Sequence, residues 1–331
     1  MSGRVSIAFQ TDKPLTAYGA LAQQVERYGF DGVSVYNDML YQPAWLPLLE
    51  IAKATRRVRI GPAAVNPFTC HPITIAGQIA QIDEASQGRA YLGLARGGWL
   101  DFVGLEPAKP VSALREAFAS IAHLLQGNID PLPGEFFSLA GGDTMRWPMY
   151  RRQIPFLLGS WGAKTIGACI EFIDEVKIGG SANPDLLSYF HQIVTDAAAS
   201  RDCQADIGLV LGAVSVVDMD GRAARELARR EVALYVPIVA GLDSTLRIDP
   251  DLLIRLKAAA ECYDFEAAGS LISDELLRKF AFAGTPEDVA DQVNEALARG
   301  AARVELGTPH GLDEEEGLRL LGEYVLPAIS M

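Results

Sequence analysis

Glycine, alanine and a few polar residues follow the short apolar runs of this 331-residue chain, whereas clusters of acids and bases do not. These positions are Gln10, Thr11, Asn37, Asp38, 63–66, 96–99, Ser160, Trp161, 179–181, Val216, Val217 and 308–310. If the runs are parallel strands, these positions share one edge of the sheet, where α/β enzymes place their active sites. Small residues beside amides suit a flat aromatic ligand that lies against the backbone.

Two of these strand ends have the composition of an anion site. The segment GSWGAKT, residues 159–165, places small residues, a serine and a lysine where a strand passes into a helix. Free N–H groups at such a junction favour a phosphate. The segment GGSANPD, residues 179–185, repeats the arrangement, with Ser181 or Asn183 able to cap the next helix. Helix capping alone explains both segments equally well, so both interpretations stay open.

Other catalytic schemes fit the sequence less well. Ser160 lacks the G-x-S-x-G pattern of a serine hydrolase. The histidines show no paired metal-ligand spacing, so no metal site is predicted; they are His71, His123, His191 and His310. His71 precedes Pro72 and is expected to serve the turn. His310 is the histidine best placed to contact a substrate, although a surface-loop position explains it as well. Asp38 is a candidate acid or base, or an ordinary turn residue.

Charge and composition exclude several classes of partner. The chain has 29 Lys and Arg against 42 Asp and Glu, a net charge of −13, which disfavours nucleic acid and anionic membranes as partners. The cysteines are far apart, as in a reducing compartment; they are Cys70, Cys169, Cys203 and Cys262. The N-terminus lacks a signal pattern, and no apolar run approaches the roughly 20 residues that span a bilayer. We expect a cytoplasmic protein.

The elements that must position these residues alternate along the whole chain. Apolar runs typical of strands occupy residues 4–10, 31–38, 57–65, 89–98, 154–160, 174–180, 205–217 and 302–308, and helical patterns separate them. Right-handed crossovers repeated between parallel strands predict a (β/α)8 TIM barrel. An open doubly wound sheet is disfavoured, because residues 9–15, FQTDKPL, lack the G-x-G-x-x-G loop.

Two segments interrupt this alternation. Residues 128–153, after the fourth helix, are rich in Pro, Gly and aromatic residues and predict a surface hairpin or excursion. A long helical region from about 221 to 279, broken at Pro237 and Pro250, precedes the last strand. No low-complexity linker divides the chain, so we expect a single domain over residues 1–331.

The order of several segments resembles the bacterial-luciferase-like superfamily, and within it the coenzyme F420-dependent branch typified by methylenetetrahydromethanopterin reductase. The segments are GFDGVSVYND, RIGPAAVNPFTCHP, IDEASQGRAYLGLARGGWLDFVGL, KPVSALREAF, PFLLGSWGAKT, GTPEDVADQV and LLGEYVLP. The resemblance extends over essentially the whole chain. It implies a TIM barrel, usually dimeric, that holds a flavin or deazaflavin at its C-terminal mouth.

The resemblance also implies which residues touch the cofactor. A non-prolyl cis peptide bond is implied at Ala63-Ala64, where the backbone supports one face of the ring. The contacts carried over are Asn37, Ala63, Ala64, Val65, Asn66, Arg96, Gly97, Gly98, Ser160, Trp161, Gly162, Lys164, Gly179 and Gly180. Arg96 and Lys164 would offset the charge of a phosphate and an acidic tail.

The chain departs from the archaeal reductases of this branch at three acidic positions. Those enzymes carry acids where this chain has Ala8, Asn37 and, approximately, Gly98. Because these acids handle the pterin substrate and its protons, we expect a substrate other than methylenetetrahydromethanopterin.

The expected function is therefore hydride transfer between C5 of F420 and a small organic substrate. Gln10, Asn37 and His310 are the polar groups expected to contact the substrate or transfer its proton. One alternative keeps the fold and uses reduced FMN in a monooxygenase. Another is a flavin-binding barrel without catalytic activity. The resemblance also implies a homodimer.

Overall fold

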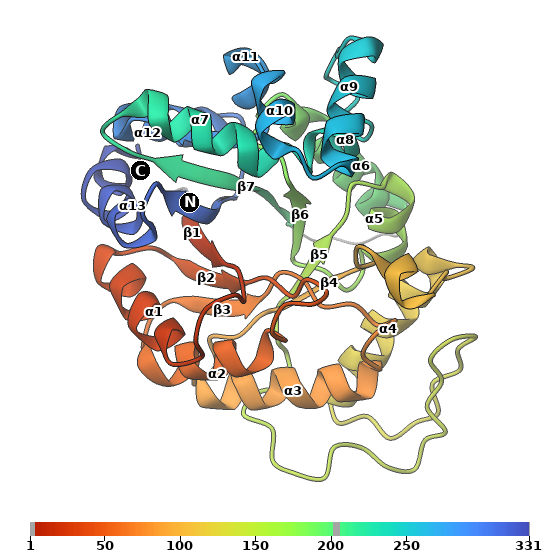
Figure 1. Ribbon diagram of the computed structural model, residues 1–331. Helices are drawn as coiled ribbons and strands as arrows, with labels where there is room; N and C mark the ends of the chain where they lie inside the picture. Colours follow the sequence, from red (N-terminus) through yellow and green to blue (C-terminus); the bar gives the residue numbers. More distant parts are fainter. Residues whose placement is uncertain (1–3, 201–205, 331) are drawn as a thin grey trace.

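Eight parallel strands form a nearly closed barrel within residues 4–200 and 206–330, the part described by the computed structural model (Figure 1). They are β1 (Arg4–Phe9), β2 (Gly32–Val35), β3 (Arg59–Pro62), β4 (Leu92–Ala95), β5 (Phe156–Gly159), β6 (Glu175–Gly179), β7 (Gly208–Val217) and β9 (Arg303–Gly311). Their order is β3-β2-β1-β9-β7-β6-β5-β4, and bridges from Ile60 to Ala90 and from Val65 to Leu94 join the two ends. The predicted (β/α)8 barrel is confirmed. Cys203 and residue 205, the predicted start of the seventh strand, lie outside the described residues.

Helices surround the barrel and connect its strands. They are α1 (Ala17–Tyr28), α2 (Trp45–Ala54), α3 (Pro72–Ala85), α4 (Pro110–Leu125), α5 (Ala163–Cys169), α6 (Leu186–Ser200), α7 (Gly221–Val232), α12 (Pro286–Ala298) and α13 (Glu314–Leu320). The chain ends in a π-helical turn, η2 (Leu321–Val325), and a 3-10 turn, η3 (Leu326–Ala328). His71 caps α3, as expected, because its Nδ1 accepts a hydrogen bond of 3.2 Å from the Ile73 N–H. None of the described helices is both long and apolar enough to cross a membrane.

The predicted helical region before the last strand divides where its prolines stand. It contains α7 and then α8 (Val236–Val239), α9 (Pro250–Glu261), α10 (Phe265–Ser270) and α11 (Asp274–Leu277). Pro237 and Pro250 lie in the first turns of α8 and α9, where the missing N–H has no cost. The sequence did not predict β8 (Ala281–Gly284), which pairs in parallel with Val214–Val217 of β7. Its four residues are too few to show strand alternation.

The segment from 128 to 153 is an excursion without regular strands, apart from one antiparallel bridge between Leu132 and Leu139. Figure 1 shows it as the yellow-green loop below α3 and α4. Its end is fixed to α3 by an ion pair of 2.8 Å between Arg151 Nη2 and Asp83 Oδ1. The predicted excursion is therefore present, and it covers helices rather than the mouth of the barrel.

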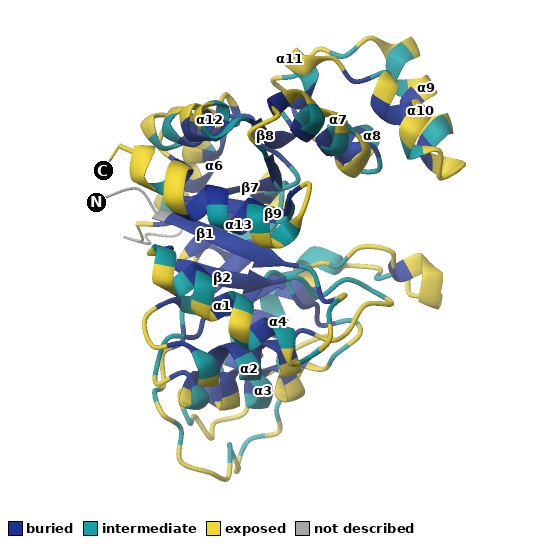
Figure 2. Ribbon diagram, turned by 60° about the vertical axis from the view of Figure 1, so that its left-hand side comes forward, coloured by how far each residue is buried: buried dark blue, intermediate teal, exposed yellow. Residues whose placement is uncertain are grey.

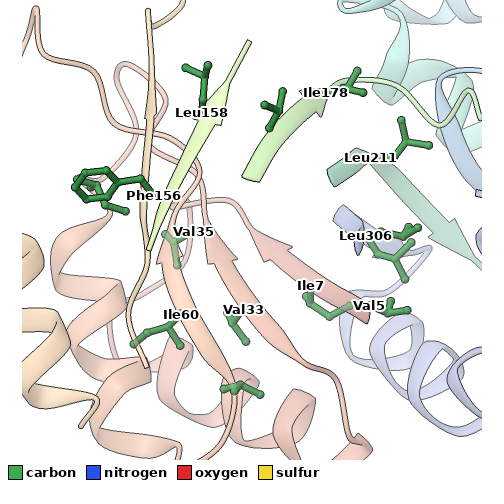
Figure 3. Close-up of a cluster of buried hydrophobic side chains, with 14 of the residues drawn as sticks. Val5, Ile7, Val33, Val35, Ile60, Phe156, Leu158, Ile178, Leu211 and Leu306 are labelled. Carbon is green, nitrogen blue, oxygen red and sulfur yellow. The ribbon is translucent and has the colours of Figure 1, made fainter. Parts of the chain in front are cut away.

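The outward faces of the strands are apolar and pack beneath the helices. Figure 3 shows this layer, which contains Val5, Ile7, Val33, Val35, Ile60, Phe156, Leu158, Ile178, Leu211 and Leu306. Figure 2 shows the strands as the most deeply buried part of the molecule. Burial of this layer supplies the main hydrophobic stabilisation of the barrel.

The inward faces of β6 and β9 carry charge. Glu175 and Lys177 lie two residues apart on the inward face of β6, and Arg303 and Glu305 lie two residues apart on the inward face of β9. Each of these four residues is at most 7% exposed. Arg303 Nη2 lies 2.7 Å from Glu175 Oε2, and its Nη1 lies 3.2 Å from Glu305 Oε2. The Lys177 ammonium pairs with Glu305. We call these four residues the interior ion network.

Neutral polar groups complete the interior ion network. The Ser34 hydroxyl donates to the Glu305 carboxylate, and its oxygen lies 2.6 Å from the Tyr91 hydroxyl. Arg303 Nη1 also donates to Ser6 Oγ over 2.9 Å. Buried charges are tolerated only when they are paired and hydrogen-bonded in this way. The network therefore links β1, β2, β6, β9 and Tyr91, the residue just before β4, across the barrel axis.

Replacing Lys177 with Met should leave the Glu305 carboxylate buried without its ammonium partner. We expect a decrease of about 3–5 kcal/mol in the free energy of unfolding, measured by urea denaturation. Lys257→Met is the matched control, because Lys257 is 69% exposed, and it should change this free energy by less than about 0.5 kcal/mol. A Lys177→Met variant as stable as the control would show that the network does not stabilise the barrel.

The pH dependence of stability should also depend on Glu305. Burial alone would raise its pKa, but Lys177 and Arg303 lower the pKa below the usual 4.5. A lowered pKa in the folded state stabilises the protein above the unfolded-state pKa, and this contribution is lost as the pH falls through the folded-state value. We therefore expect the free energy of unfolding to fall below about pH 4.5 in the wild type.

Glu305→Gln removes this titrating group and should show a shallower loss of stability across the acid range. Glu84→Gln, on the exposed side of α3, should follow the wild-type pH profile. Chemical denaturation at a series of pH values measures both. Parallel profiles for wild type and Glu305→Gln would contradict the expectation.

Candidate functional site

The C-terminal ends of the strands form one face of the barrel, which we call the mouth. In Figure 2 the strands point towards the right, and α8 and α10 extend beyond their ends. The 3-10 turn η1 (Leu100–Val103), gold in Figure 1, also projects near this face. The sequence-predicted site residues follow these strand ends, so the fold brings most of them to the mouth.

The end of β3 is held against β4 by its backbone. The Ala63–Ala64 peptide bond is cis, the geometry that the resemblance implies at this position. The Val65 N–H donates to the Gly93 carbonyl over 3.0 Å, and the Ala95 N–H donates to the Val65 carbonyl over 3.0 Å. Ala63 and Ala64 remain partly exposed, so their backbone is available to a ligand at the mouth.

Asn66 holds the turn that follows. Its Oδ1 accepts hydrogen bonds from the N–H groups of Phe68, at 3.0 Å, and Thr69, at 2.9 Å. Its amide also lies against Gly97, where an added Cβ would come within 2.9 Å of Asn66 Nδ2. Gly97 has a φ of +87°, which glycine adopts readily. Asn66 therefore joins the turns that follow β3 and β4. Its side-chain oxygen already accepts hydrogen bonds from the backbone.

The turn after β4 lines a hollow at the mouth. A cavity of about 480 Å³ is bordered by residues 96–101 and by Leu105, Glu106 and Pro107. Arg96 and Gly98 are exposed, and a Cβ on Gly98 would meet no atom within 4 Å. Arg96, Gly97 and Gly98 thus leave room for a ligand, with a guanidinium at its border.

The ends of β5 and β6 contact each other through Trp161. Its Nε1 donates to the Gly179 carbonyl over 3.0 Å, and its ring packs edge-on against Phe190 at 5.8 Å. Ser160 Oγ accepts a 3.1 Å hydrogen bond from the Gly162 N–H. Lys164 is exposed in the first turn of α5. These residues, predicted to contact a cofactor, form one continuous rim.

The segment 179–185 is fixed by internal hydrogen bonds. Gly180, with a φ of +77°, donates its N–H to the Gly212 carbonyl over 2.7 Å. The buried Asn183 side chain donates to Asp243 and to Thr245, each over 2.9 Å, and accepts from Lys279 Nζ over 3.0 Å. These contacts favour the structural interpretation of Ser181 and Asn183, and they anchor the loop after α8 to the barrel.

The polar residues predicted to contact a substrate already make hydrogen bonds within the protein. Gln10 Nε2 donates to Asp38 Oδ2 over 2.8 Å, and the Thr11 N–H donates to Gln10 Oε1 over 2.8 Å. Asn37 Oδ1 accepts from the Ala44 N–H over 3.0 Å. Gln10, Asn37 and Asp38 are half-buried at the mouth. The Asp38 carboxylate is therefore held in one orientation and faces the same space as the other two residues.

His310 lies within β9 and is buried, so it does not occupy the surface loop that was one of its two expected positions; its contact with a substrate stays a prediction. Its side chain has no exposed area, and its ring packs edge-on against Phe9 at 5.5 Å. Its Nδ1 lies 3.5 Å from Glu314 Oε1, which is also 3.1 Å from Lys13 Nζ. The ring therefore lies beside the first turn of α13, which begins at Glu314.

Two tyrosines at the mouth escaped the sequence-based prediction. Tyr36 is the last residue before Asn37, and Tyr235 immediately precedes α8. Burial and the nearby Asp38 raise the pKa of Tyr235 to about 12. Tyr36 and Tyr235 are almost 200 positions apart in the sequence, so periodicity could not have linked them to one site. Within the described residues, no group of three or more His, Cys, Asp or Glu side chains could hold a metal ion.

Comparison with known proteins identifies relatives over the whole chain. Residues 2–303 match the profile of the family described as luciferase-like monooxygenase. The 5,10-methylenetetrahydromethanopterin reductase of Archaeoglobus fulgidus is 30% identical over 314 residues, covering 92% of this chain and 93% of that protein.

Solved structures share the fold. The coenzyme F420 dependent tetrahydromethanopterin reductase from Methanopyrus kandleri superposes with a TM-score of 0.89 at 24% identity, covering 100% of both chains. An F420-dependent secondary alcohol dehydrogenase in complex with an F420-acetone adduct superposes with a TM-score of 0.80 at 18% identity, also covering 100% of both chains.

Asn183→Ala should loosen the loop after α8. The substitution removes the buried hydrogen bonds that Asn183 makes with Asp243, Thr245 and Lys279, so we expect the free energy of unfolding to fall by about 1–3 kcal/mol. Hydrogen exchange of residues 236–245 should accelerate at the same time. Asn128→Ala, at an exposed position after α4, should change neither quantity. Unchanged exchange in Asn183→Ala would show that this side chain does not anchor the loop.

Proposed function

This chain belongs to the luciferase-like monooxygenase family, and we propose that it is an oxidoreductase that uses coenzyme F420 to pass hydride to or from a small organic substrate. The observation that carries the proposal is the relationship, over 92% of the chain, to a methylenetetrahydromethanopterin reductase. The F420-dependent proteins with the same fold over their whole length support it.

The residues of the mouth fit a flat ring. Side chains there are small where a ring would approach the backbone, at Ala63, Ala64 and Gly179. A Cβ on Gly179 would meet only Lys177 Cε, at 4.0 Å, so space remains open above it. In this proposal the backbone from 63 to 65 supports one face of the ring, and the rim of Trp161 and Gly179 borders it.

A charged tail would extend towards the exposed cations of the rim. Arg96 borders the hollow after β4, and Lys164 is exposed at the start of α5. In a chain of net charge −13, these two side chains are the groups that we propose for a phosphate and its acidic extension. The ring and tail contacts together account for the residues that the resemblance carries over.

The chain's own contribution to the reaction is binding, orientation and exclusion of water. Bound F420 supplies or accepts a hydride at its ring, so the protein has only to place a substrate against the open face. Asp38, oriented by Gln10, is the ionisable group at this face among the predicted residues. We assign substrate contact to Gln10 and Asn37, and the buried His310 is left out of this set.

The substrate proposed here is not methylenetetrahydromethanopterin. The positions at which the resemblance expects acids hold Ala8, which has no exposed area, and Asn37, whose carbonyl oxygen accepts from Ala44. Gly98, at the third position, has no side chain at all. A second candidate, an FMN-dependent monooxygenase, is favoured by the name of the family that the chain matches.

We also propose that the chain works in the cytoplasm as a homodimer, as the resemblance implies. Sedimentation equilibrium of the purified protein would give the mass of two chains if this is correct, and the mass of one chain if it is not.

Titration of the purified protein with F420 and with FMN, followed by ligand fluorescence, separates the two candidates. We expect saturable binding of F420 and much weaker binding of FMN. Arg96→Ala should weaken F420 binding about 10-fold, the effect of losing one charge-assisted hydrogen bond. Arg27→Ala, at an exposed position of α1, is the control and should leave F420 affinity unchanged. Binding of FMN alone would reject F420 as the cofactor.

A further inference from the structure

His310 is a fully buried histidine whose ring makes no hydrogen bond. Its side chain has no exposed area, and within the part of the chain that the structure describes neither ring nitrogen has a hydrogen-bond partner. The ring packs edge-on against Phe9, and in the sheet His310 pairs with Val216 of β7. Both of these neighbours are apolar. A buried imidazole without a partner is unusual, so the charged groups on its remaining side need attention.

The Glu314 carboxylate, at the start of α13, lies on that side. Its Oε1 is 3.5 Å from His310 Nδ1 and 3.1 Å from Lys13 Nζ, so one oxygen faces two groups that can carry positive charge. Burial alone would raise the pKa of Glu314, but His310 and Lys13 lower it. Burial alone would lower the pKa of Lys13, but Asp12 and Glu314 raise it. The carboxylate and the ammonium therefore both stay charged around neutral pH.

Lys13 belongs to the turn between β1 and α1 and is tied to its neighbours there. Its N–H donates to the Tyr18 hydroxyl over 3.1 Å, and the same hydroxyl donates to the Gln10 carbonyl over 3.1 Å. The Lys13 carbonyl accepts a 2.6 Å hydrogen bond from Gln42 Nε2, in the loop after β2. A change in the position of Lys13 is therefore passed to Gln10 through Tyr18.

Gln10 carries this connection into the mouth. Its Nε2 donates to Asp38 Oδ2 over 2.8 Å, and its Oε1 accepts from the Thr11 N–H over 2.8 Å. The Thr11 carbonyl accepts in turn from the Gln42 N–H over 3.2 Å. The orientation of the Asp38 carboxylate therefore depends on the same turn that Lys13 occupies.

Histidine is the side chain that ordinarily changes charge between about pH 5 and 8. The charged and titratable groups grouped around this ring are Glu314 on α13, Lys13 and Asp12 in the turn after β1, and Tyr18 on α1. Burial raises the pKa of Tyr18, so its hydroxyl stays neutral. Because Glu314 and Lys13 keep their charges, His310 is the member of this set whose charge can change in that range.

We propose that His310 is a positioning residue for the mouth. With a proton on its ring it takes the Glu314 carboxylate from Lys13, and the turn that carries Gln10 becomes looser. Burial favours this exchange, because an unpaired imidazolium without exposure is far more destabilising than an ammonium that keeps Asp12 as its partner at 2.8 Å. The inference rests on the proposed function, which assigns substrate contact to Gln10, and adds control of that site by pH.

Hydrogen exchange of the purified full-length chain tests this role without a substrate. Protection factors of residues 10–13 and 36–42, corrected for intrinsic exchange, are compared at about pH 8 and about pH 5.5, on either side of the range in which histidine titrates. In the wild type we expect both to fall about two- to fivefold at the lower pH, the effect of losing one partly buried ion pair. His310→Phe keeps a ring against Phe9 and loses no hydrogen bond, so it should match the wild type at the higher pH and show no such fall.

Lys13→Met and Glu314→Gln remove the ion pair itself. Both should show, already at the higher pH, the low protection of the acidic wild type, with little further change. His191→Gln is the matched control, because His191 is exposed on α6, and it should respond to pH as the wild type does. The positioning role is overturned if His310→Phe or Glu314→Gln keeps the wild-type response to pH, or if Lys13→Met is as protected as the wild type at the higher pH.

Titration of the wild type with F420 at both pH values separates this inference from the proposed function. We expect F420 to bind at both. Binding of F420 without a pH response of residues 10–13 rejects the positioning role alone. A pH response that requires His310, in a protein that binds no F420, rejects the proposed cofactor and leaves the positioning role standing.

Discussion

Burial of two carboxylates inside the barrel is the constraint on which the structure most depends. Glu175 and Glu305 are almost completely removed from water. Arg303 and Lys177 offset their charge inside the barrel, and Arg59 Nη1 also lies 3.2 Å from Glu175 Oε1. An unpaired charge at such a depth is far more costly than the pair. The strands that carry these residues therefore hold one register. Ser6 of β1, Ser34 of β2 and Tyr91, just before β4, complete the hydrogen bonding.

The same constraint decides where a ligand can bind. Charged side chains fill the middle of the barrel, and Tyr36 covers Lys177 at the level of the mouth. Above the network the inward positions are small, as at Gly179 and Gly212, where a Cβ on Gly212 would come within 3.0 Å of Lys177 Cε. The interior ion network therefore forms the bottom of the space at the mouth, and the glycines, which have no side chains, leave that space open to a ligand. Fold stability and the proposed cofactor site share these residues.

The barrel could be predicted because eight apolar runs alternate with helices. Hydrophobic periodicity is a local signal, so it can be recognised in the sequence without knowing the tertiary contacts. It also contained an unused signal for the interior ion network. The pairs Glu175 with Lys177 and Arg303 with Glu305 are two residues apart within strands that otherwise read as apolar, a spacing that places both charges of each pair on one face. In a parallel barrel strand with an apolar outer face, two charged residues at this spacing indicate side chains that point into the barrel interior.

Other features of the candidate site depend on contacts that no local pattern encodes. Asn66 and Asn183 resemble ligand residues in sequence, but the structure uses their amides to hold turns. His310, expected just beyond the last strand, lies within β9 and is buried between Phe9 and Glu314. The loop after α8 is anchored to the barrel by Asn183, a residue about 60 positions away in the sequence. In each case tertiary packing, rather than propensity, decides the role.

The most direct measurement of the central claim is a crystal structure of the protein with F420 bound. The account predicts the ring against the backbone of Ala63, Ala64 and Val65, its charged tail beside Arg96 and Lys164, and its open face towards Gln10 and Asn37. A ring bound elsewhere, or a tail that avoids both cations, would contradict it.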